Sequence, residues 1–197
     1  MSALPKFNPI SPEAYLAMER ASLHEKHEYF RGEIYAMTGA SRTHVEIIHN
    51  LNGLLYQQRK KTGCRAYAND LRVKVQKNGL YTYPDIAIVC GEPQFEDDQF
   101  DTLLNPLVII EVLSPSTERY DRGTKFQLYQ GIDSLQEYVL VSQDQLIVER
   151  FRRTEQSWVY TKLDSLEATL QFDSLDLQLA LAEIYETITF EDRPNPR

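Results

Sequence analysis

One carboxylate lies inside the most apolar run of the sequence. Glu111 belongs to "PLVIIEVL" (106–113), where all the remaining residues after the proline are leucine, isoleucine or valine. Such a run is typical of a central strand that is buried on both faces. An ionised carboxylate in that environment is very costly unless it is paired with a cation, bound to a metal or protonated. Glu111 therefore requires a partner.

Asp85 is the first candidate to act together with Glu111. It follows Pro84 in "YTYPDIAIV" (81–89), and a proline marks the start or the edge of a strand because it has no N–H to donate. If the two strands pair, both carboxylates meet at one end of the sheet. Close carboxylates raise each other's pKa unless a cation lies between them, and a hard divalent ion such as magnesium suits oxygen ligands. The alternative for Asp85 is a turn hydrogen bond beside the proline.

Lys125 is a second candidate partner for Glu111. It lies in "YDRGTKFQLYQG" (120–131), which predicts a helix that ends near Gly131. A buried salt bridge to Glu111 is the structural alternative to a metal site. A spacing of four residues separates Asp121, Lys125 and Tyr129, so their side chains share one face of the predicted helix. This face meets Glu111 if the helix folds back over the strand. A surface pair of Lys125 with Asp121 would stabilise the helix by only about 0.2–0.5 kcal/mol.

Three further residues are supporting candidates. Asp70 precedes a predicted strand and is an additional metal-ligand candidate, with the capping of a turn as the alternative. Glu46 lies on a helix predicted over 41–63, but Thr43 and Glu46 match the T-x-x-E capping box, which explains the glutamate without catalysis. His44 falls on the apolar stripe of the same helix and is interpreted as a packing residue near the cleft.

Charge is distributed unevenly along the chain. The formal net charge of −8 argues against non-specific nucleic-acid binding by the whole surface. The charged residues of 59–77 are nevertheless all basic except Asp70, and the charged residues of 92–101 are all acidic. One interpretation is that the first contacts phosphates and the second repels them; the other, which we favour for charge runs in general, is that both are solvated surfaces. The candidate nucleic-acid-binding residues are Arg59, Lys60, Lys61, Arg65, Arg72 and Lys74.

The elements that position these residues follow from hydrophobic periodicity and turn signals. Their order predicts an α/β or α+β fold, a sheet with helices packed on it, in a single domain over 1–197. A first helix begins at Ser11–Pro12–Glu13, and Arg31–Gly32 and Asn78–Gly79 predict hairpin turns. We expect a second helix at 41–63, a third at 120–131, strands at 64–76, 80–90, 106–113, 135–142, 145–153 and 157–163, and a short last helix at 179–188.

Composition limits the class of protein. The 197 residues suit one domain with a real core, and no apolar run approaches the roughly 18 residues that span a bilayer. "MSALPKFNPISPEAY" (1–15) lacks the basic and apolar regions of a signal peptide. Two cysteines without a CxxC predict neither a disulfide framework nor a thiolate zinc site, and a cytoplasmic protein fits that pattern.

Taken together, a proline-aspartate before one strand and a glutamate inside the next resemble the PD-(D/E)xK nuclease superfamily. The segments "YPDIAIV", "LVIIEVLSPST" and "DRGTKFQLYQGIDSLQEYVLV" are similar to the Uma-two family of restriction-endonuclease-like proteins. The resemblance covers about 29–148. It implies a restriction-endonuclease-like core with a mixed, mainly four-stranded central sheet, helices on both sides and a metal site at one end, followed by extra C-terminal strands and a short helix at about 149–190.

The resemblance also implies a chemistry. Asp85 and Glu111 correspond to the two motif acids and would hold Mg²⁺ or Mn²⁺ for the hydrolysis of DNA, and a homodimer is expected by analogy. The superfamily places a lysine two residues after the acid, where this chain has Leu113, so Lys125 is the expected substitute. The alternative is a nuclease fold that has lost catalysis and serves as a nucleic-acid-binding or regulatory protein.

Overall fold

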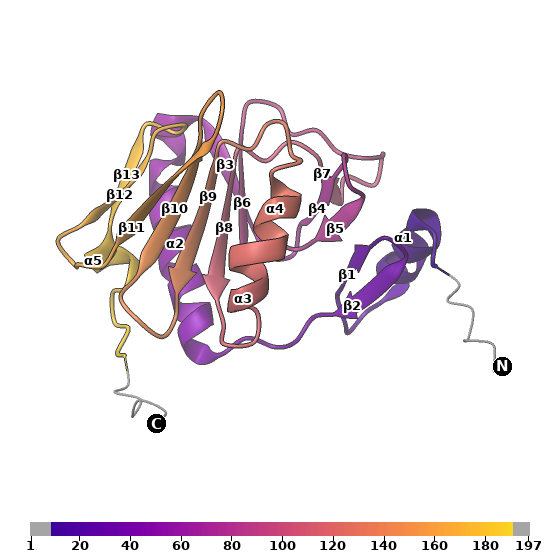
Figure 1. The fold of residues 1–197 in the computed structure, drawn as a ribbon, viewed down its shortest axis with the longest axis horizontal. Coiled ribbons are helices and arrows are strands. Elements are labelled where there is room, and N and C mark those ends of the chain that lie inside the picture. Colours follow the sequence, from indigo (N-terminus) through magenta and orange to yellow (C-terminus); the bar gives the residue numbers. More distant parts are fainter. Residues whose placement is uncertain (1–8, 191–197) are drawn as a thin grey trace.

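The computed structural model describes residues 9–190 and is built around a six-stranded mixed sheet (Figure 1). Strands β8 and β9 in its middle run parallel, and the other neighbours are antiparallel. The predicted mixed sheet is thus confirmed, and the C-terminal strands extend it beyond four strands. Its order is β11 (Trp158–Leu163), β10 (Val148–Arg153), β9 (Glu137–Ser142), β8 (Val108–Leu113), β6 (Ile86–Cys90) and β3 (Cys64–Ala68).

A smaller five-stranded sheet lies beside the first. Two strands predicted as continuous, 64–76 and 80–90, each contribute to both sheets. The first breaks at a turn in which the N–H groups of Asp70 and Leu71 both donate to Ala68, and the second breaks at Pro84. The order of the smaller sheet is β2 (Glu33–Ala36), β1 (His27–Phe30), β5 (Leu80–Thr82), β4 (Arg72–Val75) and β7 (Thr102–Leu103).

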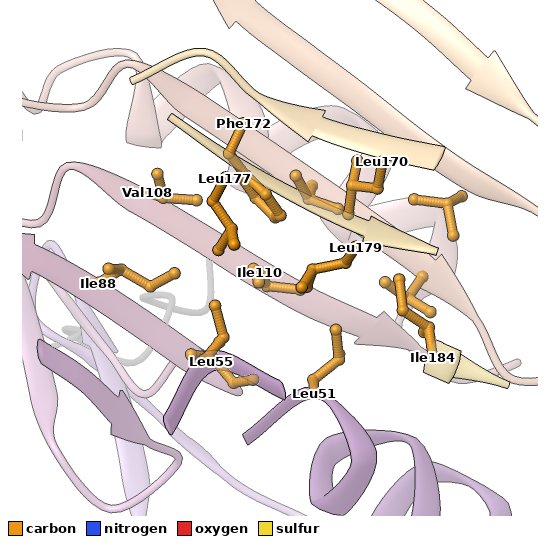
Figure 2. Packing of buried hydrophobic residues seen from close by; sticks show 14 of the residues in the cluster. Leu51, Leu55, Ile88, Val108, Ile110, Leu170, Phe172, Leu177, Leu179 and Ile184 are labelled. Atoms are coloured by element: carbon orange, nitrogen blue, oxygen red, sulfur yellow. The ribbon is translucent and has the colours of Figure 1, made fainter. Parts of the chain in front are cut away.

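Helix α2 (Arg42–Thr62) covers one face of the large sheet. Its start is capped by Ser41, whose side chain accepts from the N–H of His44, and it ends at Gly63, whose φ of 68° suits glycine. The capping box expected at Thr43 is therefore wrong, because the helix begins earlier. Leu51 and Leu55 of α2 pack against the large sheet and the C-terminal hairpin (Figure 2).

The opposite face of the large sheet carries the predicted helix that follows β8 (Figure 1). It consists of α3 (Glu118–Tyr120), the π-helical turn η1 (Asp121–Lys125) and α4 (Phe126–Tyr129). Tyr129 is completely buried in the cluster beneath it. The first predicted helix is also present as α1 (Pro12–Ala21), capped by Ser11, with proline at its first position.

The C-terminal region contains a hairpin that the sequence interpretation missed. Strands β12 (Thr169–Phe172) and β13 (Leu177–Ala180) pair with each other, and α5 (Leu181–Ile184) is shorter than the expected 179–188. The apolar side chains of the two strands alternate with polar ones, the pattern of a half-buried hairpin. Their buried residues, Leu170, Phe172, Leu177 and Leu179, complete the core above α2 (Figure 2).

The cysteine prediction is wrong. Cys64 and Cys90 face each other in the β3–β6 pair and form a disulfide, with a Cα–Cα distance of 4.2 Å. Strand pairing brought them together, which their spacing in the sequence did not reveal. The argument from cysteine usage for a reducing compartment therefore no longer applies. Within 9–190 no helix has the length and apolarity needed to cross a membrane, and residues 1–8, part of the segment inspected for a signal peptide, lie outside the described chain.

Candidate active site

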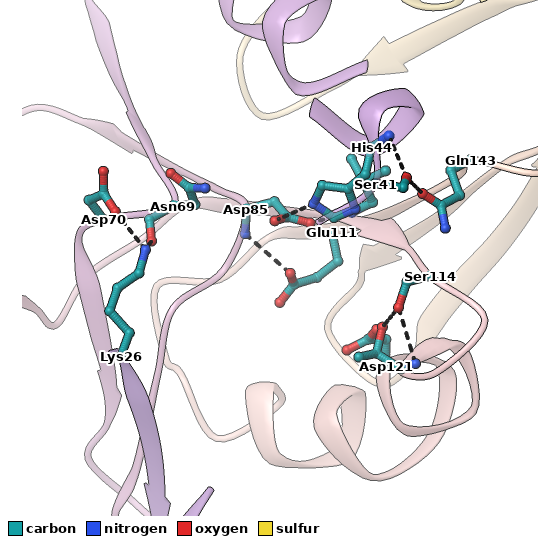
Figure 3. A network of polar contacts seen from close by, with 12 residues as sticks. Lys26, Ser41, His44, Asn69, Asp70, Asp85, Glu111, Ser114, Asp121 and Gln143 are labelled. Atoms are coloured by element: carbon teal, nitrogen blue, oxygen red, sulfur yellow. Dashed lines mark hydrogen bonds and ion pairs between the residues drawn. The ribbon is translucent and has the colours of Figure 1, made fainter. Parts of the chain in front are cut away.

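Asp85 and Glu111 meet where the chain passes from the small sheet into the large one. The antiparallel register pairs Ile86 with Ile110, so that the next position outward places Asp85 opposite Glu111. The backbone N–H of Asp85 donates to Oε2 of Glu111 at 3.2 Å (Figure 3). The expected convergence of the two carboxylates at one end of the sheet is therefore present.

The Asp85 carboxylate is held from two sides. Its Oδ2 accepts the backbone N–H of Val112 at 2.7 Å, and its Oδ1 lies 3.1 Å from Nε2 of His44. Within residues 9–190, the Nδ1 of His44 is buried and has no hydrogen-bond partner. His44 reaches this position because it lies in the first turn of α2, directly after the Ser41 cap. The histidine interpreted as a packing residue thus contacts a site carboxylate.

Lys125 points into the site from η1. Its Nζ lies 3.0 Å from Oε1 of Glu111 and 3.7 Å from Oδ1 of Asp121. The hydroxyl of Tyr129 donates to the same Oε1 of Glu111 at 2.8 Å. The helical face expected from the four-residue spacing therefore does meet Glu111, across a π-helical turn. Glu111 and Lys125 are almost completely buried, with side chains 6% and 8% exposed.

Glu28 is a site residue that the sequence interpretation missed. It lies on β1, and its Oε1 is 3.2 Å from the ammonium group of Lys125. Thr82 of β5 donates a hydrogen bond to the same oxygen. The ammonium group is therefore held between two carboxylates from different sheets. The available signal was the alternation of the hairpin, which places Glu28 on the opposite face from the buried Tyr29.

Burial controls the ionisation of these groups. It raises the pKa of Glu111 to about 8, with Lys125 opposing the shift and Asp85 adding to it. Burial alone would lower the pKa of Lys125, but the surrounding acids, Glu111 foremost, raise it well above its usual value. Burial also raises the pKa of Asp121. A charged lysine thus faces carboxyl groups that hold protons more tightly than usual.

The two motif acids fit a hard divalent cation. Asp85 and Glu111 offer hard carboxylate oxygens, and each oxygen can accept more than one partner. Within residues 9–190 no group of three or more His, Cys, Asp or Glu side chains forms a ready ligand set. The protein would therefore supply two carboxylates and leave the other positions to water and phosphate, as magnesium sites commonly do.

These groups line the floor of a cleft of about 770 Å³. One wall is formed by the β1–β2 hairpin and the segment that leads to α2. The opposite wall carries the hydroxyls of Ser114, Ser116 and Thr117 after β8. Asp85, Glu111, Lys125, Asp121 and His44 all line this cleft, so the chain has one concave space in which the predicted catalytic groups converge.

Two supporting candidates lie apart from this centre. Asp70 is bound to Lys26 at 2.6 Å, with its side chain 86% exposed, and Figure 3 shows this pair to one side of Asp85 and Glu111. Glu46 points to the surface, where it pairs with Arg42 at 3.5 Å. The structure therefore does not bring either carboxylate to the site.

The basic candidates divide into two groups. Arg72 is buried, contacting Asp101 at 3.0 Å and donating to Tyr83 and Thr102, and Lys74 pairs with Glu96. The acidic stretch thus neutralises part of the basic one, and the expectation that Arg72 contacts phosphates is wrong because it holds the small sheet together. The remaining candidates are exposed: Arg59, Lys60 and Lys61 lie at the end of α2 that is far from His44, and Arg65 lies on β3 directly after it.

Comparison with known proteins bears on the family and on the fold. The Uma2 family model, described as "Putative restriction endonuclease", matches residues 12–182. The uncharacterised proteins slr1290 and sll1609 of Synechocystis sp. PCC 6803 are 36% and 32% identical, over 93% and 83% of this chain and 95% and 92% of their own lengths. A crystal structure of a "putative nuclease belonging to DUF820" from Anabaena variabilis has a TM-score of 0.73 at 19% identity, covering 92% of this chain and 100% of its own. The last likeness shows a shared fold.

Proposed function

Since the chain belongs to the Uma2 (Uma-two) family and carries a nuclease-like fold, we propose that it is a metal-dependent endonuclease that hydrolyses DNA phosphodiester bonds. The observation that supports this most strongly is the convergence of Asp85, Glu111 and Lys125 at the floor of a single cleft. The DUF820 protein with the same fold is itself titled a putative nuclease.

Each residue has a role in the proposed reaction. Asp85 and Glu111 would hold Mg²⁺ or Mn²⁺, which when bound polarises the scissile phosphate and acidifies a coordinated water. Lys125 directs its ammonium toward the same space and stabilises negative charge that develops on the phosphate. Glu28 and Tyr129 orient Lys125 and Glu111, respectively, through the contacts described above.

The lysine missing after the motif acid has a substitute. Leu113 is buried in an apolar cluster beneath the helix, so no cation can act from that position. Lys125 places an ammonium group next to Glu111 from another element. This contact favours a catalytic protein over the alternative, a nuclease fold retained only for binding or regulation.

Two further features belong to the proposal. One such site cuts one strand, so a homodimer would supply the second site for a double cut. The exposed basic residues at the end of α2 and the start of β3, Arg59, Lys60, Lys61 and Arg65, would contact flanking phosphates. With DNA as its substrate, the protein would act in the cytoplasm.

The test uses purified protein with Mn²⁺ and circular DNA, in both supercoiled double-stranded and single-stranded form. The proposal expects internal cutting that EDTA stops and that Asp85→Asn and Glu111→Gln abolish. Glu183→Gln, an exposed carboxylate on α5, should leave the rate unchanged. Circular dichroism and thermal melting would show that each variant is folded. No cutting of either DNA, or cutting that survives both substitutions, would contradict the proposal.

A further inference from the structure

Two exposed tyrosines border the cleft above the buried site. Tyr35 on β2 is 48% exposed and Tyr120 at the end of α3 is 37% exposed, and both line the cleft. Within residues 9–190 neither ring contacts another aromatic ring or a cation, in contrast to the interior tyrosines, several of which stack on one another. Each tyrosine therefore presents a partly exposed aromatic surface to the cleft, although the hydroxyl of Tyr35 donates a hydrogen bond to Glu33.

Glu28, which contacts Lys125, is a neighbour of one of these tyrosines on the β1–β2 hairpin. Tyr35 is paired directly with Glu28 across the β1–β2 hairpin, so both side chains extend from the same face. Tyr120 directly precedes Asp121, and burial, followed by the charge of Glu28, raises its pKa to about 12. The tyrosines thus approach Glu28 and Lys125 from two different elements.

The depth of the site restricts what can reach it. Glu111 and Lys125 are 6% and 8% exposed, and the cleft of about 770 Å³ has the size of a pocket for a small ligand. A flexible single strand can bring a backbone phosphate to groups this deeply buried more readily than a rigid base-paired helix can.

The charges that line the cleft also favour a substrate with unpaired bases. Acids outnumber bases there: the lining contains five acids, Glu25, Glu28, Asp85, Glu111 and Asp121, against two lysines, Lys26 and Lys125, and two histidines, His24 and His44. Lys26 is already paired with Asp70, and Lys125 with Glu111. Affinity of the metal-free cleft therefore cannot come mainly from lysine–phosphate contacts, and base stacking on the two tyrosines is a source that the lining supplies.

We propose that the substrate is a DNA strand with unpaired bases, and that Tyr35 and Tyr120 stack on the bases next to the scissile phosphate. This inference rests on the proposed nuclease function and narrows its substrate class. Stacking on an aromatic side chain tolerates any base, so the proposal expects little sequence preference. A single strand needs only one active site, so this reaction does not require a dimer.

Binding tests the inference independently of catalysis. In EDTA, fluorescence anisotropy should show that a labelled single-stranded oligonucleotide binds at least tenfold more tightly than the same sequence as a closed duplex. Tyr35→Ala and Tyr120→Ala should each weaken single-strand binding by roughly five- to a hundredfold, whereas the phenylalanine variants should keep it. Tyr160→Ala, an equally exposed tyrosine on β11 outside the cleft, is the matched control and should bind normally.

Cleavage provides the second measurement. With Mn²⁺, the single strand should be cut faster than the duplex, and a duplex with a central bubble should be cut within the bubble. Equal binding of single strand and duplex, or alanine variants that bind like the Tyr160 control, would overturn the inference even if DNA is cut. A protein that shows the stacking pattern but cuts no DNA would contradict the nuclease proposal and leave this binding site supported.

Discussion

The ammonium group of Lys125 and the carboxylate of Glu111 lie 3.0 Å apart, linking a π-helical turn to the central strand of the sheet. This contact resolves the problem posed by a carboxylate within an apolar strand. It also supplies the cation that Leu113 cannot provide. A buried ion pair is weak evidence for stability in itself, because desolvation opposes the attraction between the charges. Its position on the floor of a cleft, beside Asp85, favours a role in catalysis.

Replacing Lys125 by methionine should remove DNA cleavage and destabilise the protein. At a pH above the Glu111 pKa of about 8 the buried carboxylate would lose its cation, and removing one member of a buried ion pair typically costs about 3–5 kcal/mol. The double variant Lys125→Met/Glu111→Gln should recover part of the free energy of unfolding, since Glu28 still lacks the ammonium group, but none of the activity. Urea denaturation and a cleavage assay on the four proteins of this cycle measure both effects. A single Lys125→Met variant with full activity would exclude this lysine from the reaction.

The pKa of Glu111 predicts the direction of the pH dependence. Burial raises this pKa to about 8, so the folded protein binds the proton more tightly than the unfolded chain. The proton therefore stabilises the metal-free protein at low pH, and this contribution should decline as the pH rises from about 4.5 to about 8. Mn²⁺ must displace the proton, so metal affinity should increase over the same range, by at most about tenfold per pH unit. Glu111→Gln should lack this component of the stability change in EDTA. Identical pH profiles for the two proteins would contradict the assignment.

The structure explains in part why a sequence interpretation locates this site but not its surroundings. Glu111 could be identified from the sequence because a charge within an apolar strand requires a partner. The spacing of Asp121, Lys125 and Tyr129 indicated which face of the helix supplies that partner. Glu28 gave no such signal, because it lies in an ordinary alternating hairpin and reaches Lys125 only through the packing of one sheet against the other.

The wrong prediction for the basic stretch and the missed strand pairs have a related cause. Arg72 belongs to a basic stretch of sequence, yet the pairing of β4 with β7 places it beside Asp101 in the interior. Net charge along a segment carries no information about which side chains turn inward. The disulfide and the β12–β13 hairpin were missed for the same reason, because both depend on which strands pair. The sequence predicts 64–76 and 80–90 as continuous strands because it does not indicate that there are two sheets.

Asp101→Asn should destabilise the fold in a manner that depends on pH. Arg20 and Arg72 hold the pKa of Asp101 well below its usual value, so its charge stabilises the folded state at neutral pH. That stabilisation is present above the usual carboxyl pKa of about 4 and is lost as the pH falls through the lower folded-state value. We expect a loss of about 1–3 kcal/mol in the free energy of unfolding at pH 7 and a somewhat smaller loss at pH 3, where the unfolded chain has taken up the proton but the folded-state carboxylate is still ionised. Chemical denaturation at both values checks this, and an equal loss at both would count against it.

The Cys64–Cys90 disulfide should contribute measurably to stability. It closes a loop with a sequence separation of 26, for which chain entropy predicts about 3–4 kcal/mol. The double variant Cys64→Ser/Cys90→Ser should therefore unfold at lower urea than the oxidised protein, and about where the reduced wild type does. Thiol labelling followed by mass spectrometry counts the free cysteines in each sample. Fully labelled wild-type protein purified without reductant would show that the bond does not form.

The titration of metal-free protein with Mn²⁺, followed by isothermal calorimetry near pH 8, tests the central claim most directly. At this pH about half of Glu111 has lost its proton, so the proton competes less with the metal than at lower pH. The account predicts a saturable site in the wild type and in Glu183→Gln, and at least tenfold weaker binding in Asp85→Asn and in Glu111→Gln. Wild-type protein without saturable binding, or Asp85→Asn that binds Mn²⁺ as tightly as the wild type, would contradict a metal centre built on these two carboxylates.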